Sequence, residues 1–183
     1  MLDRIARRLT LAIAATLAAG VVRAGESYGI GRPATPQEIA GWDIDVSPSG
    51  AGLPPGRGDA RQGEAIFADK CAACHGARGE GKPMDRLVGG MGTLRDKKPD
   101  KTVGSYWPYA TTLFDFVRRA MPLNAPQSLT PDEVYAVSAY VLFLNGIVPQ
   151  DTTLDADNLA KINMPNRNGF VSAQSPPAAG AKP

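Results

Sequence analysis

The stretch CAACH at positions 71–75 contains both cysteines and the single histidine of this 183-residue chain. The pattern C-x-x-C-H is the attachment site of a c-type haem. Two thiols three positions apart at a helix end can each add to one haem vinyl group, and the imidazole that follows can bind the iron through one ring nitrogen. The motif therefore predicts one covalently bound haem c, attached at Cys71 and Cys74, with His75 as an axial iron ligand.

Other sites that use paired cysteines fit this chain less well. A structural zinc site needs four ligands, and the chain has no second cysteine or histidine pair. A thioredoxin-like redox pair is expected in a βαβ setting, which the sequence does not indicate. A disulfide across so short a loop would add little stability.

Because the chain has a single histidine, few residue types can supply the sixth iron ligand. A second histidine ligand is excluded, so a lysine, a methionine or a vacant position remains. Met84 and Met91 follow His75 closely, in the loop expected on the histidine side of the haem, from which reaching across the ring is difficult. Met121 follows a predicted helix and precedes another, so it can approach the opposite side. We predict Met121 as the sixth ligand, with Met164 as the alternative.

His/Met ligation has a functional meaning. A thioether ligand favours Fe(II) and raises the reduction potential, and a filled sixth position excludes oxygen and substrates. Such a haem carries one electron and does little bond chemistry. The chain is therefore predicted to be an electron-transfer protein with no catalytic residues. An open iron position would instead indicate a gas sensor or a peroxidase.

Three helices are predicted, which makes the fold class all-α with long loops. The first follows an N-cap at Asp59 and runs to residue 70. The second spans 111–120 and is stopped by Pro122. The third begins with the capping box TPDE at 130–133, continues with apolar residues at helical spacing to Leu144, and ends at an Asn-Gly pair.

The first and last helices are expected to cross. Gly63 and Phe67 would meet Tyr140 and Leu144 there, which is a packing role and not a chemical one. The glycine-rich stretch 76–101 has no regular pattern, and so long a loop is unusual in a compact domain unless it wraps something.

The N-terminus has the features of a bacterial secretory signal. The positively charged region contains Arg4, Arg7 and Arg8, and residues 9–22 are mostly small and apolar. A signal-peptidase cleavage site with small or short side chains follows and ends at Ala24. An uncleaved membrane anchor is the alternative, but the apolar region is short for one. We therefore expect export to the periplasm and no membrane span after cleavage.

Removal of the signal also changes the charge of the chain. The segment carries four arginines and one aspartate, so the formal charge falls from +2 to −1 on cleavage after Ala24. A nearly neutral mature protein lacks the basic surface that binds nucleic acid or anionic lipid. Neither is expected as a partner.

The segment before the first helix is rich in proline and glycine, and helices longer than a turn or two are not expected in it. Trp42, Ile44 and Val46 alternate with acidic residues, which suggests an extended piece laid over the domain. A flexible linker is the alternative, although linkers seldom carry a large aromatic side chain.

The expected organisation has five parts. They are a signal peptide at 1–24, an irregular N-terminal arm at 25–58, a cytochrome c domain at 59–150, a C-terminal extension packed on that domain at 151–170, and a disordered tail at 171–183.

Several side chains outside the motif have two possible roles. Tyr106, Trp107 and Tyr109 would either donate hydrogen bonds to haem propionates or only line the pocket wall. Three arginines have the same possible role, with solvation at the surface as the ordinary alternative: Arg95, Arg118 and Arg119. The His75 ring is expected to donate its other N–H to a loop carbonyl near Pro83.

Longer segments resemble one family, the cytochrome subunit of the Sox sulfur dehydrogenase. The segments are WDIDV at 42–46, YWPYA at 106–110, RAMP at 119–122, residues 127–145 and NMPN at 163–166. The likeness extends from about residue 31 to residue 170. It implies a class I cytochrome c fold, haem attachment at Cys71 and Cys74, and axial ligands His75 and Met121.

The resemblance also implies a partner. Cytochrome subunits of that family pair with a molybdenum-cofactor subunit that oxidises sulfur or sulfite. Typical members are longer and carry a second haem domain, whereas this chain has one attachment motif and is similar to the first domain.

We therefore expect a periplasmic one-electron carrier that accepts electrons from a molybdenum-dependent sulfite or sulfur dehydrogenase. It would pass them to a downstream cytochrome c or oxidase. A general soluble cytochrome that feeds a terminal oxidase is the alternative.

Overall fold

The computed structural model describes residues 30–173. The predicted signal peptide and the last ten residues of the predicted tail lie outside these described residues. The chain divides into two units, one ending at Gly41 and the other beginning at Trp42. The division falls inside the predicted arm at 25–58, so residues 42–58 belong with the helical unit.

The first unit contains most of helix α2 (Pro36–Trp42). The Thr35 hydroxyl accepts from the Glu38 N–H at 3.3 Å, and the Glu38 carboxylate accepts from the Thr35 N–H at 2.8 Å. Arg32 also donates to this carboxylate and lowers its pKa to about 2. No residue of α2 is buried. The helix has two turns, as much as the proline spacing was expected to permit.

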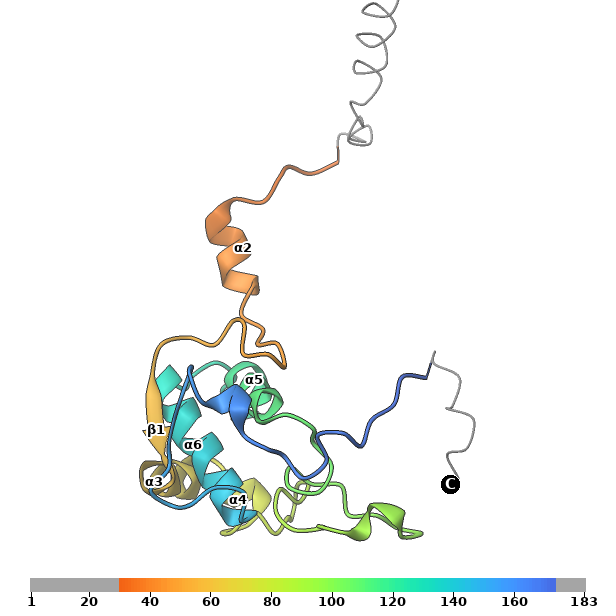
Figure 1. The fold of residues 1–183 in the computed structure, drawn as a ribbon. Coiled ribbons are helices and arrows are strands. Elements are labelled where there is room, and N and C mark those ends of the chain that lie inside the picture. The colour runs from red at the N-terminus through yellow and green to blue at the C-terminus, as the bar shows by residue number, and fades with distance from the viewer. Residues whose placement is uncertain (1–29, 174–183) are drawn as a thin grey trace, which may run out of the picture. The chain divides into compact units, whose positions relative to one another are not determined.

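The second unit holds the remaining elements, shown in Figure 1. Its helices are α3 (Ala60–Lys70), α4 (Ala72–His75), α5 (Ala110–Ala120) and α6 (Pro131–Leu144), its 3-10 turns are η1 (Thr93–Arg95) and η2 (Leu159–Lys161), and its strands are β1 (Arg57–Asp59) and β2 (Thr153–Asp155). Between α4 and α5 the chain contains only η1, so the long predicted loop is confirmed.

The helix boundaries follow the capping signals in the sequence. The Asp59 carboxylate accepts from the Gln62 N–H at 2.9 Å, and the Gln62 side chain accepts from the Asp59 N–H at 3.0 Å, so α3 begins with a capping box. Thr130 and Glu133 make the same reciprocal pair at the start of α6. The predicted N-cap and capping box are both confirmed.

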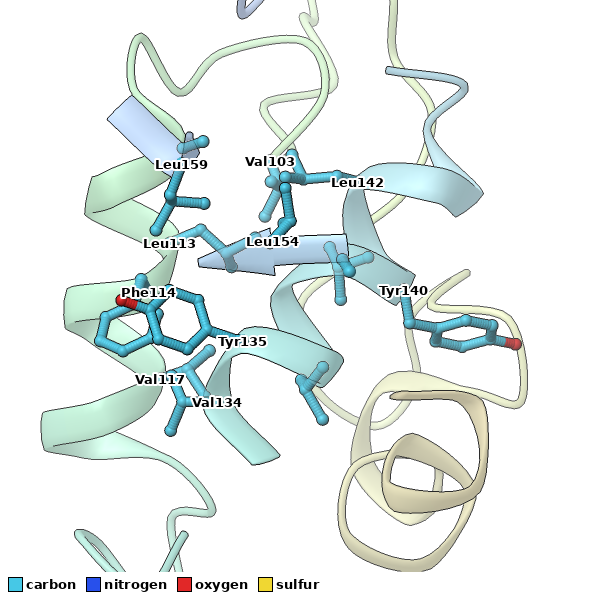
Figure 2. Packing of buried hydrophobic residues seen from close by; sticks show 14 of the residues in the cluster. Val103, Leu113, Phe114, Val117, Val134, Tyr135, Tyr140, Leu142, Leu154 and Leu159 are labelled. Atoms are coloured by element: carbon cyan, nitrogen blue, oxygen red, sulfur yellow. The ribbon is translucent and has the colours of Figure 1, made fainter. Parts of the chain in front are cut away.

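Helix α6 is the centre of the unit. All residues from Val134 to Leu142 are buried, and Figure 2 shows side chains of α5, β2 and η2 gathered around it. The predicted crossing of α3 and α6 is present. A Cβ on Gly63 would lie 2.0 Å from the Ala136 carbonyl oxygen, and the Phe67 and Tyr140 rings are 5.4 Å apart.

A two-stranded antiparallel sheet was not predicted. Strand β1 pairs with β2, with Gly58 opposite Leu154. Three-residue strands are too short to leave an alternation pattern in the sequence. The pairing places residues 153–161 against the helices, and Leu154 and Leu159 are fully buried there. Within residues 30–173, no helix is long and apolar enough to cross a membrane.

Candidate functional site

The CAACH stretch forms one tight turn at the end of α3. Cys71 caps α3 by donating its N–H to the Phe67 carbonyl at 2.9 Å, and it also precedes α4. The N–H groups of Cys74 and His75 both donate to the Cys71 carbonyl, at 3.1 and 3.0 Å. The two cysteines are not bonded to each other. Both thiols and the imidazole are thus carried on a single helical turn.

The loop after this turn fixes the imidazole. His75 Nδ1 lies 2.7 Å from the carbonyl oxygen of Asp85. A carbonyl can only accept, so Nδ1 carries the ring proton and Nε2 keeps its lone pair for a metal. The loop is tied to the same turn by hydrogen bonds from Gly81 N–H to the His75 carbonyl at 2.7 Å and from Met84 N–H to the Cys74 carbonyl at 2.9 Å. The expected acceptor near Pro83 is therefore Asp85.

The chemistry of Cys71, Cys74 and His75 limits which metal or cofactor these residues can bind. Burial raises the pKa of the Cys71 thiol to about 11, so the neutral thiol is the stable form in this setting. In the described part of the chain, no group of three or more His, Cys, Asp or Glu side chains could hold a metal ion. A haem brings four nitrogen ligands of its own and needs only axial ligands from the protein. One oriented imidazole beside two thiols fits that requirement.

The four methionines proposed or weighed as ligands lie in different environments. Met84 and Met91 are 45% and 50% exposed, whereas Met164 is 1% exposed within the hydrophobic core. Met121 is half-buried at the end of α5 and packs against the core edge, and its N–H donates to the Val117 carbonyl at 3.1 Å. Met164 therefore has a packing role already, which favours Met121 as the ligand.

Two comparisons with known proteins bear on this turn. A family model described as cytochrome c matches residues 60–145. The chain is also similar to a chain in the crystal structure of the sulfane dehydrogenase SoxCD from Paracoccus pantotrophus, with 46% sequence identity and a TM-score of 0.77 over 81% of this chain and 73% of that one. The chain belongs to the cytochrome c family. A search among curated proteins found no significant match.

Family membership gives the fold and the broad function. The cytochrome has the class I cytochrome c fold, with mostly helical structure, long loops and a small antiparallel sheet. It is an electron-transfer protein, and the family implies haem c as its cofactor. The oriented imidazole and the adjacent thiols fit that cofactor.

The three aromatic residues near Pro108 are half-buried in the cytochrome. Tyr106 packs edge-on against Phe170 and lies below the Lys101 ammonium, and the Tyr109 ring lies 5.3 Å from the Arg167 guanidinium. Trp107 packs edge-on against Phe116. These contacts use the ring faces and edges, and a role of the rings in lining the haem pocket stays a prediction. A role for their polar tips towards propionates stays a prediction.

The arginines of α5 have partners that sequence reasoning missed. Arg118 Nη1 donates to the Ile44 carbonyl at 3.0 Å, and Arg119 Nε donates to the Asp115 carboxylate at 2.9 Å. Both guanidinium groups therefore have protein partners, and a role for either towards a propionate stays a prediction. Arg95, in contrast, is exposed on η1.

Asn145 is a second residue whose role the sequence did not reveal. Its side chain accepts from the Gly89 N–H at 3.0 Å and donates to the carbonyls of Leu87 and Val141 at 3.2 and 2.9 Å. A Cβ on Gly104 would lie 2.2 Å from its Oδ1. Asn145 therefore ties the end of α6 to the long loop. The Asn-Gly signal indicated the helix end, but nothing local indicates the loop partners.

Replacing Asn145 by alanine is expected to lower the free energy of unfolding by about 2–3 kcal/mol, because three hydrogen bonds are lost at a position only 8% exposed. Guanidinium unfolding of the haem-loaded cytochrome measures this. Asn158→Ala is the matched control, since Asn158 also bonds backbone groups but is closer to solvent. Equal losses in the two variants would contradict the prediction.

Proposed function

We propose that this cytochrome is a periplasmic monohaem carrier that accepts single electrons from a molybdenum-dependent sulfur or sulfite dehydrogenase. The observation that carries the proposal is the CAACH turn with its imidazole oriented by Asp85, in a chain 46% identical to a chain of a sulfane dehydrogenase structure. The predicted export signal supports the periplasmic location.

The site residues have separate tasks in this proposal. Cys71 and Cys74 attach one haem c through thioether bonds, and His75 binds the iron through Nε2 while Nδ1 stays on the Asp85 carbonyl. Met121 supplies the sixth ligand from the end of α5. When bound, the haem supplies an Fe(III)/Fe(II) couple that takes up one electron at a time.

The protein limits that chemistry to electron transfer. With the haem bound, a thioether from Met121 would fill the position at which oxygen, carbon monoxide or peroxide binds. The Asp85 carbonyl holds the His75 imidazole in one orientation and one tautomer, with Nε2 left to bind the iron of a haem. A gas sensor or peroxidase would need the sixth position open.

The proposed partner explains the stoichiometry of the electrons. A molybdenum centre takes two electrons from its substrate and passes them singly to a haem. The description of the similar structure as a sulfane dehydrogenase favours a sulfane-sulfur substrate over free sulfite. The electrons would then leave to a downstream cytochrome c or oxidase.

Mixing the oxidised cytochrome with the molybdenum dehydrogenase from the same periplasm tests the proposal. On addition of sulfur substrate or sulfite, the haem spectrum is expected to change to that of the reduced form, and only when the dehydrogenase is present. The two proteins should also co-purify at salt concentrations that release weak electron-transfer partners.

The controls for this mixture are heat-treated dehydrogenase and an unrelated soluble cytochrome c. A cytochrome that dithionite reduces readily but the dehydrogenase does not would contradict the proposed partner. Equal reduction rates for the unrelated cytochrome would favour a general carrier. Reduction by sulfite, and not by a carrier-bound sulfur, would identify the substrate of the partner.

A further inference from the structure

A segment that precedes the haem domain in sequence lies along the helix that presents Met121. We infer that residues 43–54, here called the strap, hold α5 so that Met121 stays on the iron, and that Asp115 and Arg118 are the positioning residues. The inference rests on the proposed function, in which Met121 is the sixth ligand.

The strap contacts one face of α5 over two turns. Arg118 Nη1 donates to the Ile44 carbonyl at 3.0 Å, the Asp115 carboxylate accepts from the Val46 N–H at 2.8 Å, and the Thr111 hydroxyl is 3.4 Å from the Pro48 carbonyl. Positions 111, 115 and 118 share a face of a helix. Their strap partners advance as the helix positions fall, so the strap runs antiparallel to α5.

The lengths of the two segments agree with this arrangement. The seven helical steps from Thr111 to Arg118 span about 10 Å. The four extended steps from Ile44 to Pro48 span about 13 Å. The strap can therefore follow the helix with no large detour, and it returns through a turn that brings the Gly52 carbonyl within 3.4 Å of Arg118 Nη1.

All three face contacts use backbone atoms of the strap and side chains of α5. The side chains that make these contacts therefore all belong to α5. The most buried charged side chain among them is Asp115, which is 9% exposed. Arg119 pairs with the same carboxylate, so the charge of Asp115 is compensated while one oxygen holds the Val46 N–H. Substitutions of these α5 side chains are therefore the most direct way to remove the contacts between the helix and the strap.

The strap is itself a folded piece. Ser47 N–H donates to the Ala51 carbonyl at 2.9 Å, and a Cβ on Gly52 would lie 2.1 Å from the Asp45 carbonyl oxygen. Its far end is held separately, because the Tyr135 hydroxyl on α6 donates to the Pro54 carbonyl at 2.9 Å. The strap thus connects α5 to the central helix.

The neighbouring side of α5 packs on the core. The Phe114 ring lies 4.5 Å from the Tyr135 ring, and Leu113 and Val117 are also buried, as Figure 2 shows. Core packing fixes one side of the helix and the strap fixes another. The last turn ends at Met121, whose N–H donates to the Val117 carbonyl. Releasing the strap leaves this turn held from one side, so fraying carries the thioether away from the iron more often.

The test uses the full haem-loaded protein with substitutions on α5. Arg118→Met and Asp115→Ala remove the strap contacts, whereas Arg118→Lys and Asp115→Asn keep part of them. Carbon monoxide binding to the reduced protein is followed by stopped flow, and the charge-transfer band of the Fe(III)–thioether bond is recorded in the oxidised protein. The first pair should bind carbon monoxide about tenfold faster than the unmodified protein, and the second pair should recover towards it.

Tyr135→Phe is the matched control. It removes the strap hydrogen bond on α6 but keeps the ring packing against Phe114 and the three strap contacts to α5, so thermal stability should fall while the carbon monoxide rate rises less than in Arg118→Met. Circular dichroism confirms that each variant is folded at the assay temperature. Should Arg118→Met not fold, Thr111→Val, which removes one weak contact, still gives a smaller increase in rate.

The outcomes separate the strap from the ligand. Unchanged rates in folded Arg118→Met and Asp115→Ala, beside a fast rate in Met121→Ala, would overturn the strap inference and leave the ligand assignment standing. A slow rate in Met121→Ala would overturn the ligand assignment itself. If Tyr135→Phe raised the carbon monoxide rate as much as Arg118→Met does, the strap would be a general stabilising element and not a specific support for Met121.

Discussion

Replacing Met121 by alanine is expected to convert the cytochrome from a closed carrier into a protein that binds carbon monoxide stoichiometrically when reduced. The thioether is lost, and Met164, the alternative ligand, is only 1% exposed in the core and is not placed to substitute. The oxidised protein should lose the charge-transfer band of the iron–sulfur bond. The reduction potential should fall by on the order of 0.1 V or more, since a thioether stabilises Fe(II).

Two other methionines provide the controls for this variant. Met91→Ala changes a half-exposed side chain in the loop and should leave the spectrum, the potential and the carbon monoxide response unchanged. Met164→Leu keeps the volume of a core residue and should cost less than about 1.5 kcal/mol in stability with no change in ligation. An unchanged spectrum in Met121→Ala, with a changed one in Met164→Leu, would transfer the ligand role to Met164.

The features that the sequence predicted well are those with a local cause. The N-cap at Asp59 and the capping box at Thr130 fix where α3 and α6 begin, and Pro122 follows the end of α5. Each depends on residues within four positions of one another, so the pattern can be read from the chain. The CAACH motif is local in the same sense, and the short turn it forms follows from its spacing.

The features that the sequence did not predict depend on distant residues. Asn145 bonds loop residues 56 and 58 positions away, and Arg118 bonds a carbonyl 74 positions away. Both partners are backbone groups, which every residue provides, so no side-chain pattern marks them. The pairing of β1 with β2 escaped prediction because strands of three residues are too short to show alternation.

Trp42 is an informative exception in the arm. The alternation of Trp42, Ile44 and Val46 suggested that all three lie on the domain. Val46 is buried and Ile44 is half-buried, but Trp42 ends α2 and is 89% exposed. The helix changes the direction of its side chain, since the two-residue period holds only in extended chain. Alternation was therefore valid from residue 44 onward.

Replacing Gly63 by alanine is expected to cost about 3 kcal/mol or more of unfolding free energy. The added Cβ would lie 2.0 Å from the Ala136 carbonyl oxygen and 2.8 Å from the Tyr140 Cβ. The nearest atom belongs to a helix backbone, so no side-chain rotation relieves the clash and α3 must move away from α6. The higher helix propensity of alanine returns only about 1 kcal/mol.

The displacement would reach the haem site, because the Cys71 N–H donates a hydrogen bond to the Phe67 carbonyl at the end of the same helix. Less haem-loaded protein should therefore accumulate, and guanidinium unfolding followed by haem absorbance should show a lower midpoint. Gly41→Ala is the matched control, since Gly41 lies in α2 and a Cβ there meets nothing within 4 Å. Equal stability of the two variants would mean that the α3–α6 contact is not the close crossing on which the fold is built.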